Sequence, residues 1–326
     1  MDNKLLEVKN LQVSIKTYRG EVQAVRDVSF SIEKGEVFCI VGESGCGKSV
    51  TAQTLMKLNP SPPTMIKNGE ILLNGKDIVP MNKHEMKSIR GREISMIFQD
   101  PMTSLNPTQR IGKQIEEVVR VHETVSEQEA RQRAISMLEK VGVPGPEERM
   151  LQYPHEFSGG MRQRVMIAMG LACDPQLLIA DEPTTALDVT IQAQILELIK
   201  QIQQEKGISV LLITHDLGVV ANMADKVAVM YAGKIVETGT CRQVMKMPMH
   251  PYTKALLAAK PTADQTKGEK LVCIEGMPPS LLNPPKGCAF ADRCSYCTEK
   301  CRNEQPKEKV IEGQHKASCH LLWDEE

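Results

Sequence analysis

The chain has 326 residues, of which 41% are hydrophobic and 25% are charged, as is ordinary for a folded globular protein. Its formal net charge of −1 provides no overall basic field that would favour nucleic acid as a partner. No apolar run reaches the ~20 residues that a membrane-spanning helix needs, and the first residues lack the apolar core of a signal peptide. We therefore expect a cytoplasmic chain with two domains, or with one large domain and an appendage.

Antiparallel strands are predicted first, because residues 4–35 alternate apolar and polar side chains. Residues 36–41 form a short apolar run typical of a buried parallel strand, and residues 49–58 have the pattern of a helix. The later elements are predicted as strands at 70–75, 94–98, 176–180 and 209–214, helices at 111–141, 158–172 and 192–205, and a closing hairpin at 227–238. The strand–helix–strand alternation near the end of this series indicates a parallel sheet core.

A glycine-rich stretch joins the strand at 36–41 to the helix at 49–58 and fits the pattern G-x-x-x-x-G-K-[ST]. Its glycines let successive backbone N–H groups point at phosphate oxygens, and the helix start adds its positive dipole end. We expect Lys48 to reach the β- and γ-phosphates and the Ser49 hydroxyl to bind Mg²⁺. The predicted nucleotide contacts in this stretch are Gly42, Ser44, Gly45, Cys46, Gly47, Lys48, Ser49 and Val50.

Polar residues follow three of the predicted strands and supply candidate catalytic groups. Asp181 is expected to hold Mg²⁺, and Glu182 to orient the attacking water as general base. His215 ends the next strand, and parallel strands would bring it to the same edge, where it could contact the γ-phosphate. Gln99 also follows a strand, and its amide could sense Mg²⁺ or water and begin a mobile loop. The predicted magnesium ligands are therefore Ser49, Gln99 and Asp181.

A second anion-binding site is predicted at the start of the helix 158–172. Ser158 stands at the N-cap position, and two glycines in the first turn leave the N–H donors and the helix dipole unobstructed. The alternative is an ordinary helix start softened by glycine.

In their order and spacing these motifs resemble the ATP-binding cassette ATPases over roughly residues 5–240. The matching stretches are Gly42–Ser49 for Walker A, Gln99 for the Q-loop, Phe157–Met161 for the signature, Leu177–Glu182 for Walker B, Ala186–Asp188 for the D-loop and His215 for the switch histidine. The signature departs from the usual Leu-Ser-Gly-Gly-Gln at both ends, and Tyr18 is similar in position to the aromatic that stacks on adenine.

The resemblance implies an α/β fold of the P-loop type, with an antiparallel β subdomain and a RecA-like parallel-sheet core. The nucleotide-binding domain would span residues 1–240, with a helical subdomain at about 100–165. Two such domains would close head to tail around two ATP molecules. Ser158 and Gly160 of one chain would then serve the nucleotide of the other.

Composition changes after about residue 240, where prolines become frequent, and we expect an irregular, Cys-rich appendage at 241–326. Met249–Leu257, Gly276–Leu281 and Pro285–Phe290 resemble the C-terminal extension of dipeptide/oligopeptide and nickel importer ATPases. This implies an ATP-hydrolysing subunit that energises peptide import. It would bind peripherally at the cytoplasmic face of the membrane to two permease subunits, beside a second, similar ATPase, with an external peptide-binding protein delivering substrate.

Two alternatives to peptide import remain open at this stage. The first is the same role in a nickel or other small-solute importer. The second, from a different class, is a soluble cassette ATPase acting on nucleic acid or ribosomes, although such proteins usually carry two cassettes or long coiled-coil inserts, neither of which this sequence has.

Five of the ten cysteines lie between residues 288 and 319. In a cytoplasmic chain disulfides are rare and crowded free thiols are an oxidation liability, so a metal site is expected. Spacing alone leaves zinc and an iron–sulfur cluster open. The stretch resembles the peptide-importer tail associated with a [4Fe–4S] cluster, and this resemblance leaves Cys297 as a spare and implies as ligands Cys288, Cys294, Cys301 and Cys319.

Overall fold

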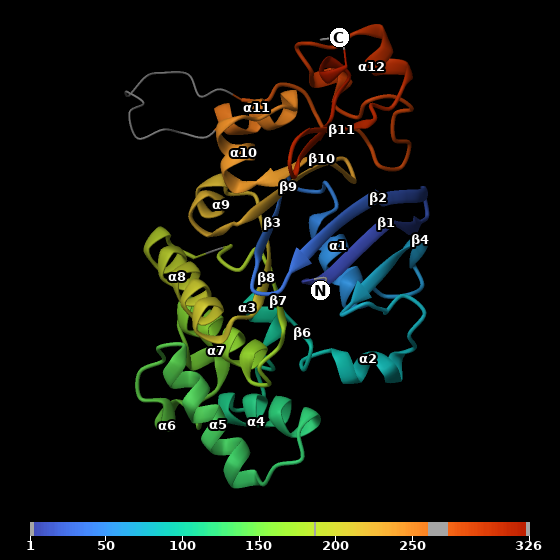
Figure 1. Ribbon diagram of the computed structural model, residues 1–326. Helices are drawn as coiled ribbons and strands as arrows, with labels where there is room; N and C mark the ends of the chain where they lie inside the picture. Colours follow the sequence, from blue (N-terminus) through green and yellow to red (C-terminus); the bar gives the residue numbers. More distant parts are fainter. Residues whose placement is uncertain (1–2, 186, 260–272, 324–326) are drawn as a thin grey trace. The chain divides into compact units, whose positions relative to one another are not determined.

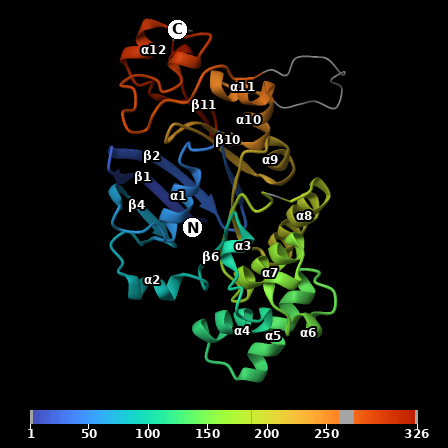
Figure 2. The same cartoon turned by 180° about the vertical axis from the view of Figure 1, so that it is seen from behind.

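The computed structural model describes residues 3–185, 187–259 and 273–323 of the chain. Its contacts divide the chain into two compact units. Unit 1 contains residues 1–5, 32–36 and 78–212, and unit 2 contains residues 6–31, 37–77 and 213–326. Figures 1 and 2 label the elements of both units.

The strands of unit 1 are β6 (Ile94–Ile97), β7 (Leu177–Asp181) and β8 (Ser209–Thr214), whose last two residues belong to unit 2. β7 lies between the other two, and it pairs in parallel with β6 from Ile94 opposite Leu177 to Ile97 opposite Ala180. Every residue of β7 and β8 is buried, as expected for strands covered on both faces.

Helices make up most of the remainder of unit 1. They are α2 (Lys83–Ile89), α3 (Pro101–Ser104), α4 (Ile111–His122), α5 (Glu127–Lys140), α6 (Pro146–Arg149), the short 3₁₀ turn η1 (Pro154–Glu156), α7 (Gly159–Leu171) and α8 (Val189–Lys206). Figures 1 and 2 both show α4, α5 and α7 side by side. On α4, Ile111, Ile115 and Val119 are fully buried, because residues four apart share one face of a helix.

The first sheet of unit 2 has four strands in the order β2-β1-β4-β5. Their bounds are β1 (Lys4–Thr17), β2 (Gly20–Glu33), β4 (Thr64–Leu73) and β5 (Lys76–Asp77). β1 and β4 are antiparallel, from Leu6 opposite Leu73 to Ile15 opposite Thr64. Asn74 and Gly75 have φ values of 48° and 78°, and they form the turn between β4 and β5.

The other strands of unit 2 pair in the order β3 (Val37–Val41), β9 (Lys226–Tyr231), β10 (Lys234–Thr240), β12 (His315–Ser318) and β11 (Glu308–Glu312). β3 is parallel to β9, and β9 and β10 form the predicted hairpin. β12 pairs with β10, with Ala317 opposite Glu237, so the tail extends this sheet. The tail is therefore more regular than the sequence suggested.

Among the described residues of unit 2, the helices are α1 (Lys48–Leu55), α9 (Leu217–Met223), α10 (Cys241–Lys246), α11 (Pro251–Ala258) and α12 (Glu299–Asn303). The 3₁₀ turns of this part are η2 (Ala291–Arg293) and η3 (His320–Leu322). Glu237 of β10 is 1% exposed and binds two parts of the tail. Its carboxylate accepts the N–H groups of Met249 and His250, at 2.8 and 2.9 Å, and lies 2.8 Å from Nε2 of His315. In the part of the chain that the structure describes, no helix is long and apolar enough to cross a membrane.

Candidate nucleotide-binding site

The predicted phosphate loop lies between β3 and α1 in unit 2. Gly42 and Gly47 have φ values of 155° and 106°, which residues with side chains rarely adopt. A Cβ at Gly42 would stand 2.1 Å from the carbonyl oxygen of Met230, and one at Gly47 would stand 2.3 Å from that of Ala24. Both ends of the loop therefore lie against neighbouring backbone, and only glycine fits there.

Lys48 begins α1 and its side chain turns back into the loop. The residue is 5% exposed, and Nζ donates to the carbonyl oxygens of Gly42, at 2.8 Å, and Glu43, at 3.0 Å. Burial raises the pKa of the neighbouring Cys46 thiol. The loop thus encloses one fixed cation at the start of a helix, an arrangement suited to binding phosphate.

The candidate general base lies in unit 1, at the end of β7. Asp181 is 3% exposed, and Glu182 follows with a φ of 46°, a left-handed conformation that non-glycine residues adopt infrequently. Gln99 Nε2 and Thr185 Oγ1 donate to the same Glu182 oxygen, at 2.9 and 3.0 Å. The structure therefore brings together Gln99 and Glu182, which follow two paired parallel strands.

The start of α7 has the predicted geometry. Ser158 is its N-cap, and its hydroxyl accepts the N–H of Met161 at 3.3 Å. Ser158 and Gly159 are exposed. A Cβ at Gly160 would lie 2.8 Å from Ile191 of α8, so packing between the two helices requires a glycine at this position. The helix start offers exposed N–H donors to an anion.

Tyr18 and His215 are both exposed and both belong to unit 2. Tyr18 lies in the turn between β1 and β2, is 90% exposed, and has the guanidinium of Arg19 5.2 Å from its ring centroid. His215 directly follows β8. The first residue of the predicted D-loop, Ala186, lies outside the described residues.

The predicted site residues are thus divided between the two units. Within unit 1 the contact between Gln99 and Glu182 is present, and within unit 2 Lys48 is seated in its loop. The assembly of these parts into one ATP site, and the magnesium ligands among them, stay predictions. Sequence reasoning missed Thr185, whose hydroxyl gives Glu182 its second donor and which no motif marks.

Four tail cysteines line one small cavity together with His250, Phe290 and His320 of the same unit; they are Cys288, Cys294, Cys301 and Cys319. Cys297 is not among the lining residues, and its thiol lies 3.5 Å from the carbonyl oxygen of Thr298. Burial raises the pKa of the Cys288 thiol to about 11. Among the described residues, no group of three or more His, Cys, Asp or Glu side chains is arranged to hold a metal ion.

Two family models match this chain: ABC transporter over residues 25–185, and Oligopeptide/dipeptide transporter, C-terminal region, over residues 236–301. The oligopeptide transport ATP-binding protein OppD of Bacillus subtilis is 59% identical, over 98% of this chain and 89% of its own length. The dipeptide transport ATP-binding protein DppD of the same species is 55% identical, over 98% of this chain and 95% of its own length. OppD of Escherichia coli is 50% identical, over 96% and 92%.

Solved structures show the same likeness. The dimeric post-hydrolysis ATP-binding cassette MJ0796 bound to ADP and Pi is 27% identical with a TM-score of 0.65, over 73% of this chain and 99% of that one. The protein cbiO1 from Clostridium perfringens, part of the ABC transporter complex cbiONQ, is 28% identical with a TM-score of 0.63, over 76% and 92%. The chain therefore belongs to the ABC transporter family. It is an ABC-type ATPase, and ATP and Mg²⁺ are the expected cofactors of such an enzyme.

Proposed function

We propose that this chain is the ATP-hydrolysing subunit that energises import of dipeptides or oligopeptides through a membrane permease complex. One observation carries the proposal: the chain matches peptide transport ATP-binding proteins over 98% of its length, tail included. The C-terminal match to the oligopeptide/dipeptide transporter region, at residues 236–301, favours peptides over the alternative of nickel or another small solute.

The proposed division of the chain follows the two family matches. Residues 1–240 form the nucleotide-binding domain, and residues 241–326 form the C-terminal extension. The match at 25–185 falls inside the first and most of the match at 236–301 inside the second, which supports the division. Residues from about 100 to 165 form the helical subdomain, supported by the run of helices from α3 to the start of α7 between β6 and β7.

The proposed ATP site uses the phosphate loop for the β- and γ-phosphates, with Lys48 as the fixed cation. Ser49, Gln99 and Asp181 hold Mg²⁺, which supplies charge neutralisation on the phosphates when bound. Glu182 accepts the proton of the attacking water, a role supported by the two hydrogen bonds that hold its carboxylate.

Three further contacts complete the proposed site. His215 contacts the γ-phosphate, and Tyr18 stacks on adenine, for which its exposed ring is suited. The start of α7, with Ser158 and Gly160, serves the nucleotide of a second chain, because an exposed helix N-terminus can bind an anion that comes from outside.

The proposed partners are two transmembrane permease subunits and a second, similar ATPase, with an extracytoplasmic peptide-binding protein acting indirectly. The chain would lie at the cytoplasmic face of the membrane, held there by the permeases. Support comes from the peptide transport relatives.

We also propose that the tail cavity holds a [4Fe–4S] cluster bound by Cys288, Cys294, Cys301 and Cys319, with zinc as the alternative. The four thiols line one cavity and Cys297 does not, which matches this ligand set. The metal bound by these thiols would hold together a segment with little core of its own.

Solute uptake tests the transport proposal. Cells lacking this subunit should lose uptake of labelled peptides and keep uptake of Ni²⁺, and the intact chain should restore the loss whereas a Lys48→Ala chain should not. Comparison of di-, tri- and longer peptides defines the preference. Loss of Ni²⁺ uptake with normal peptide uptake would support the nickel alternative instead, and unchanged uptake of both would overturn a role in either.

A further inference from the structure

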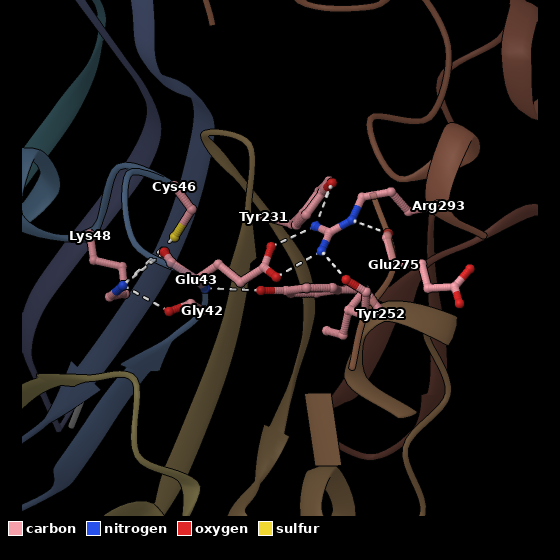
Figure 3. Close-up of polar contacts among 9 residues, drawn as sticks. Gly42, Glu43, Cys46, Lys48, Tyr231, Tyr252, Glu275 and Arg293 are labelled. Atoms are coloured by element: carbon pink, nitrogen blue, oxygen red, sulfur yellow. Dashed lines mark hydrogen bonds and ion pairs between the residues drawn. The ribbon is translucent and has the colours of Figure 1, made fainter. Parts of the chain in front are cut away.

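Glu43 of the phosphate loop is held by three different residues at once (Figure 3). Its carboxylate accepts two hydrogen bonds from Arg293, from Nη1 to Oε2 at 2.6 Å and from Nη2 to Oε1 at 2.9 Å. Its backbone N–H donates to the hydroxyl of Tyr252 at 2.9 Å. Its carbonyl oxygen accepts Lys48 Nζ at 3.0 Å. Arg293 and Tyr252 belong to the tail, so the tail and the phosphate-binding lysine meet at one loop residue.

Arg293 is a rigid anchor for this contact. Its side chain is 5% exposed, and all five of its N–H groups have acceptors. Besides the two bonds to Glu43, Nε donates to the carbonyl oxygen of Glu275 at 3.0 Å, Nη2 to that of Ile274 at 3.1 Å, and Nη1 to the hydroxyl of Tyr231 at 3.2 Å. The hydrogen bond to Glu43 raises the pKa of the guanidinium, which stays charged. A bidentate pair of this kind fixes direction as well as distance.

The Tyr252 hydroxyl is fixed equally firmly. The residue is fully buried on α11, and its ring centroid lies 4.5 Å from that of Tyr231 and 5.4 Å from that of Phe290. The guanidinium carbon of Arg293 also lies over the ring of Phe290, 5.9 Å from the centroid of that ring. Burial raises the pKa of Tyr252, so the hydroxyl keeps its proton and accepts the Glu43 N–H through oxygen. Both groups that hold Glu43 therefore come from one packed aromatic cluster in unit 2.

A hydrogen bond that served only to attach the tail to the nucleotide-binding domain could be made to any surface residue. This one ends on the residue whose carbonyl oxygen binds Lys48. We propose that the C-terminal extension positions the phosphate loop for nucleotide: Arg293 and Tyr252 fix Glu43, and Glu43 fixes Lys48. The inference rests on the proposed phosphate-binding role of Gly42–Ser49. In it Arg293 and Tyr252 are positioning residues, because they act on Lys48 through Glu43.

The electrostatics give the direction of the effect. Without Arg293, the Glu43 carboxylate becomes a half-buried negative charge without its cation, beside the proposed phosphate site. It would repel nucleotide phosphates and compete with them for the Lys48 ammonium. Loss of Arg293 should therefore weaken nucleotide binding, and removal of the Glu43 charge in the same chain should restore part of it.

The test is a titration of the full-length chain with Mg²⁺ and a fluorescent ATP analogue. Arg293→Ala should weaken binding by about fivefold or more, the usual lower range of coupling between linked sites. Glu43→Gln added to Arg293→Ala should recover part of that loss. The matched control is Arg302→Ala, because Arg302 also pairs with a carboxylate in the same tail, that of Asp292, and its side chain is 58% exposed. It should bind as the unaltered chain does.

Tyr252→Phe supplies a second variant, which removes the hydroxyl and keeps the buried ring, and it should also weaken binding. Thermal unfolding of each variant shows whether it is folded. Lys48→Ala separates the phosphate-binding role of the loop from its positioning by the tail. If this variant binds normally, the proposed phosphate loop is wrong. If Lys48→Ala loses binding while Arg293→Ala and Tyr252→Phe bind as Arg302→Ala does, the positioning role is overturned and the phosphate loop stands.

Discussion

At the residue scale, Glu182 is held through both its side chain and its backbone. One of its carboxylate oxygens accepts hydrogen bonds from Gln99 and Thr185, and its backbone turns through a left-handed conformation directly after the buried Asp181. Residues in sparsely populated backbone conformations cluster at functional sites, where the surrounding structure holds them in place.

We predict that Glu182→Gln abolishes hydrolysis and keeps ATP binding. Glutamine has the same size and retains an oxygen that can accept from Gln99, but it cannot take a proton from water. Turnover of the assembled complex should fall by about 100-fold or more, the contribution of a general base. The measurement is phosphate release together with ATP binding on the same preparation.

The control for Glu182→Gln is Glu117→Gln on α4. Glu117 also accepts a glutamine amide, that of Gln109 at 3.3 Å, and lies on an exposed face. This variant should hydrolyse ATP at the normal rate. Turnover near that of the unaltered chain in the Glu182→Gln complex would sink the general-base assignment.

Local patterns determined how much of the site the sequence could predict. Gly42 and Gly47 were found because a spacing rule identifies them, and the structure explains the rule by the carbonyl oxygens that crowd both positions. Ser158 was found because a cap precedes its helix directly. The pairing of Glu43 with Arg293 was not found, because the two residues are 250 positions apart and neither residue type is unusual at a surface.

At the element scale, burial on both faces made the strands around the site easy to predict. The run 209–214 coincides with β8, because every residue in it is apolar or small and buried. The predicted helix 111–141 is two helices, since Ser126 and Glu129 form a capping box that starts α5 anew. The alternation over residues 4–35 predicts antiparallel strands, and residues 20–33 form one of them, β2, which continues through Asp27 at a φ of 61°.

The tail strands were beyond what sequence patterns allow. β11 alternates exposed and half-buried residues, and its sequence, Glu308–Glu312, is mostly charged. It pairs with β12, and β12 pairs with β10, where the side chains of Glu237 and His315 are in contact although they are 78 positions apart. Long-range polar contacts of this kind have no periodicity to reveal them.

The tail cavity supports a prediction about metal content. Protein purified without oxygen should be brown and contain about four iron and about four sulfide per chain, as a complete [4Fe–4S] cluster requires. Cys301→Ser should lose the iron, because Cys301 lines the cavity and is 8% exposed. Iron and sulfide analysis with an absorption spectrum measures both.

The matched control is Cys297→Ser, since Cys297 belongs to the same tail but does not line the cavity. It should keep its iron. Colourless protein with stoichiometric zinc would replace the cluster by the zinc alternative. Loss of metal only in Cys297→Ser would show that the ligand set is wrong.

At the scale of the whole molecule, the chain carries two candidate anion-binding features. The phosphate loop is in unit 2, and the exposed start of α7 is in unit 1. In the proposed mechanism these two features of one chain serve different nucleotides, because each site joins the loop of one chain to the helix start of another. A single chain then contributes its phosphate loop to one site and its α7 start to another, and forms neither site alone.

We therefore predict that the purified chain alone is mostly monomeric and a poor ATPase. A nucleotide on the isolated chain lacks the N–H donors of a second α7, and loss of preorganised donors at developing charge lowers turnover by about 100-fold or more. Light scattering and phosphate release, measured over the same range of protein concentrations, test this directly. Addition of the second ATPase and the permeases to the chain should raise its turnover. When the chain carries Ser158→Ala and so loses the cap of α7, the same addition should raise turnover less. Fast hydrolysis that does not depend on concentration, from a chain shown to be monomeric, would contradict the shared site.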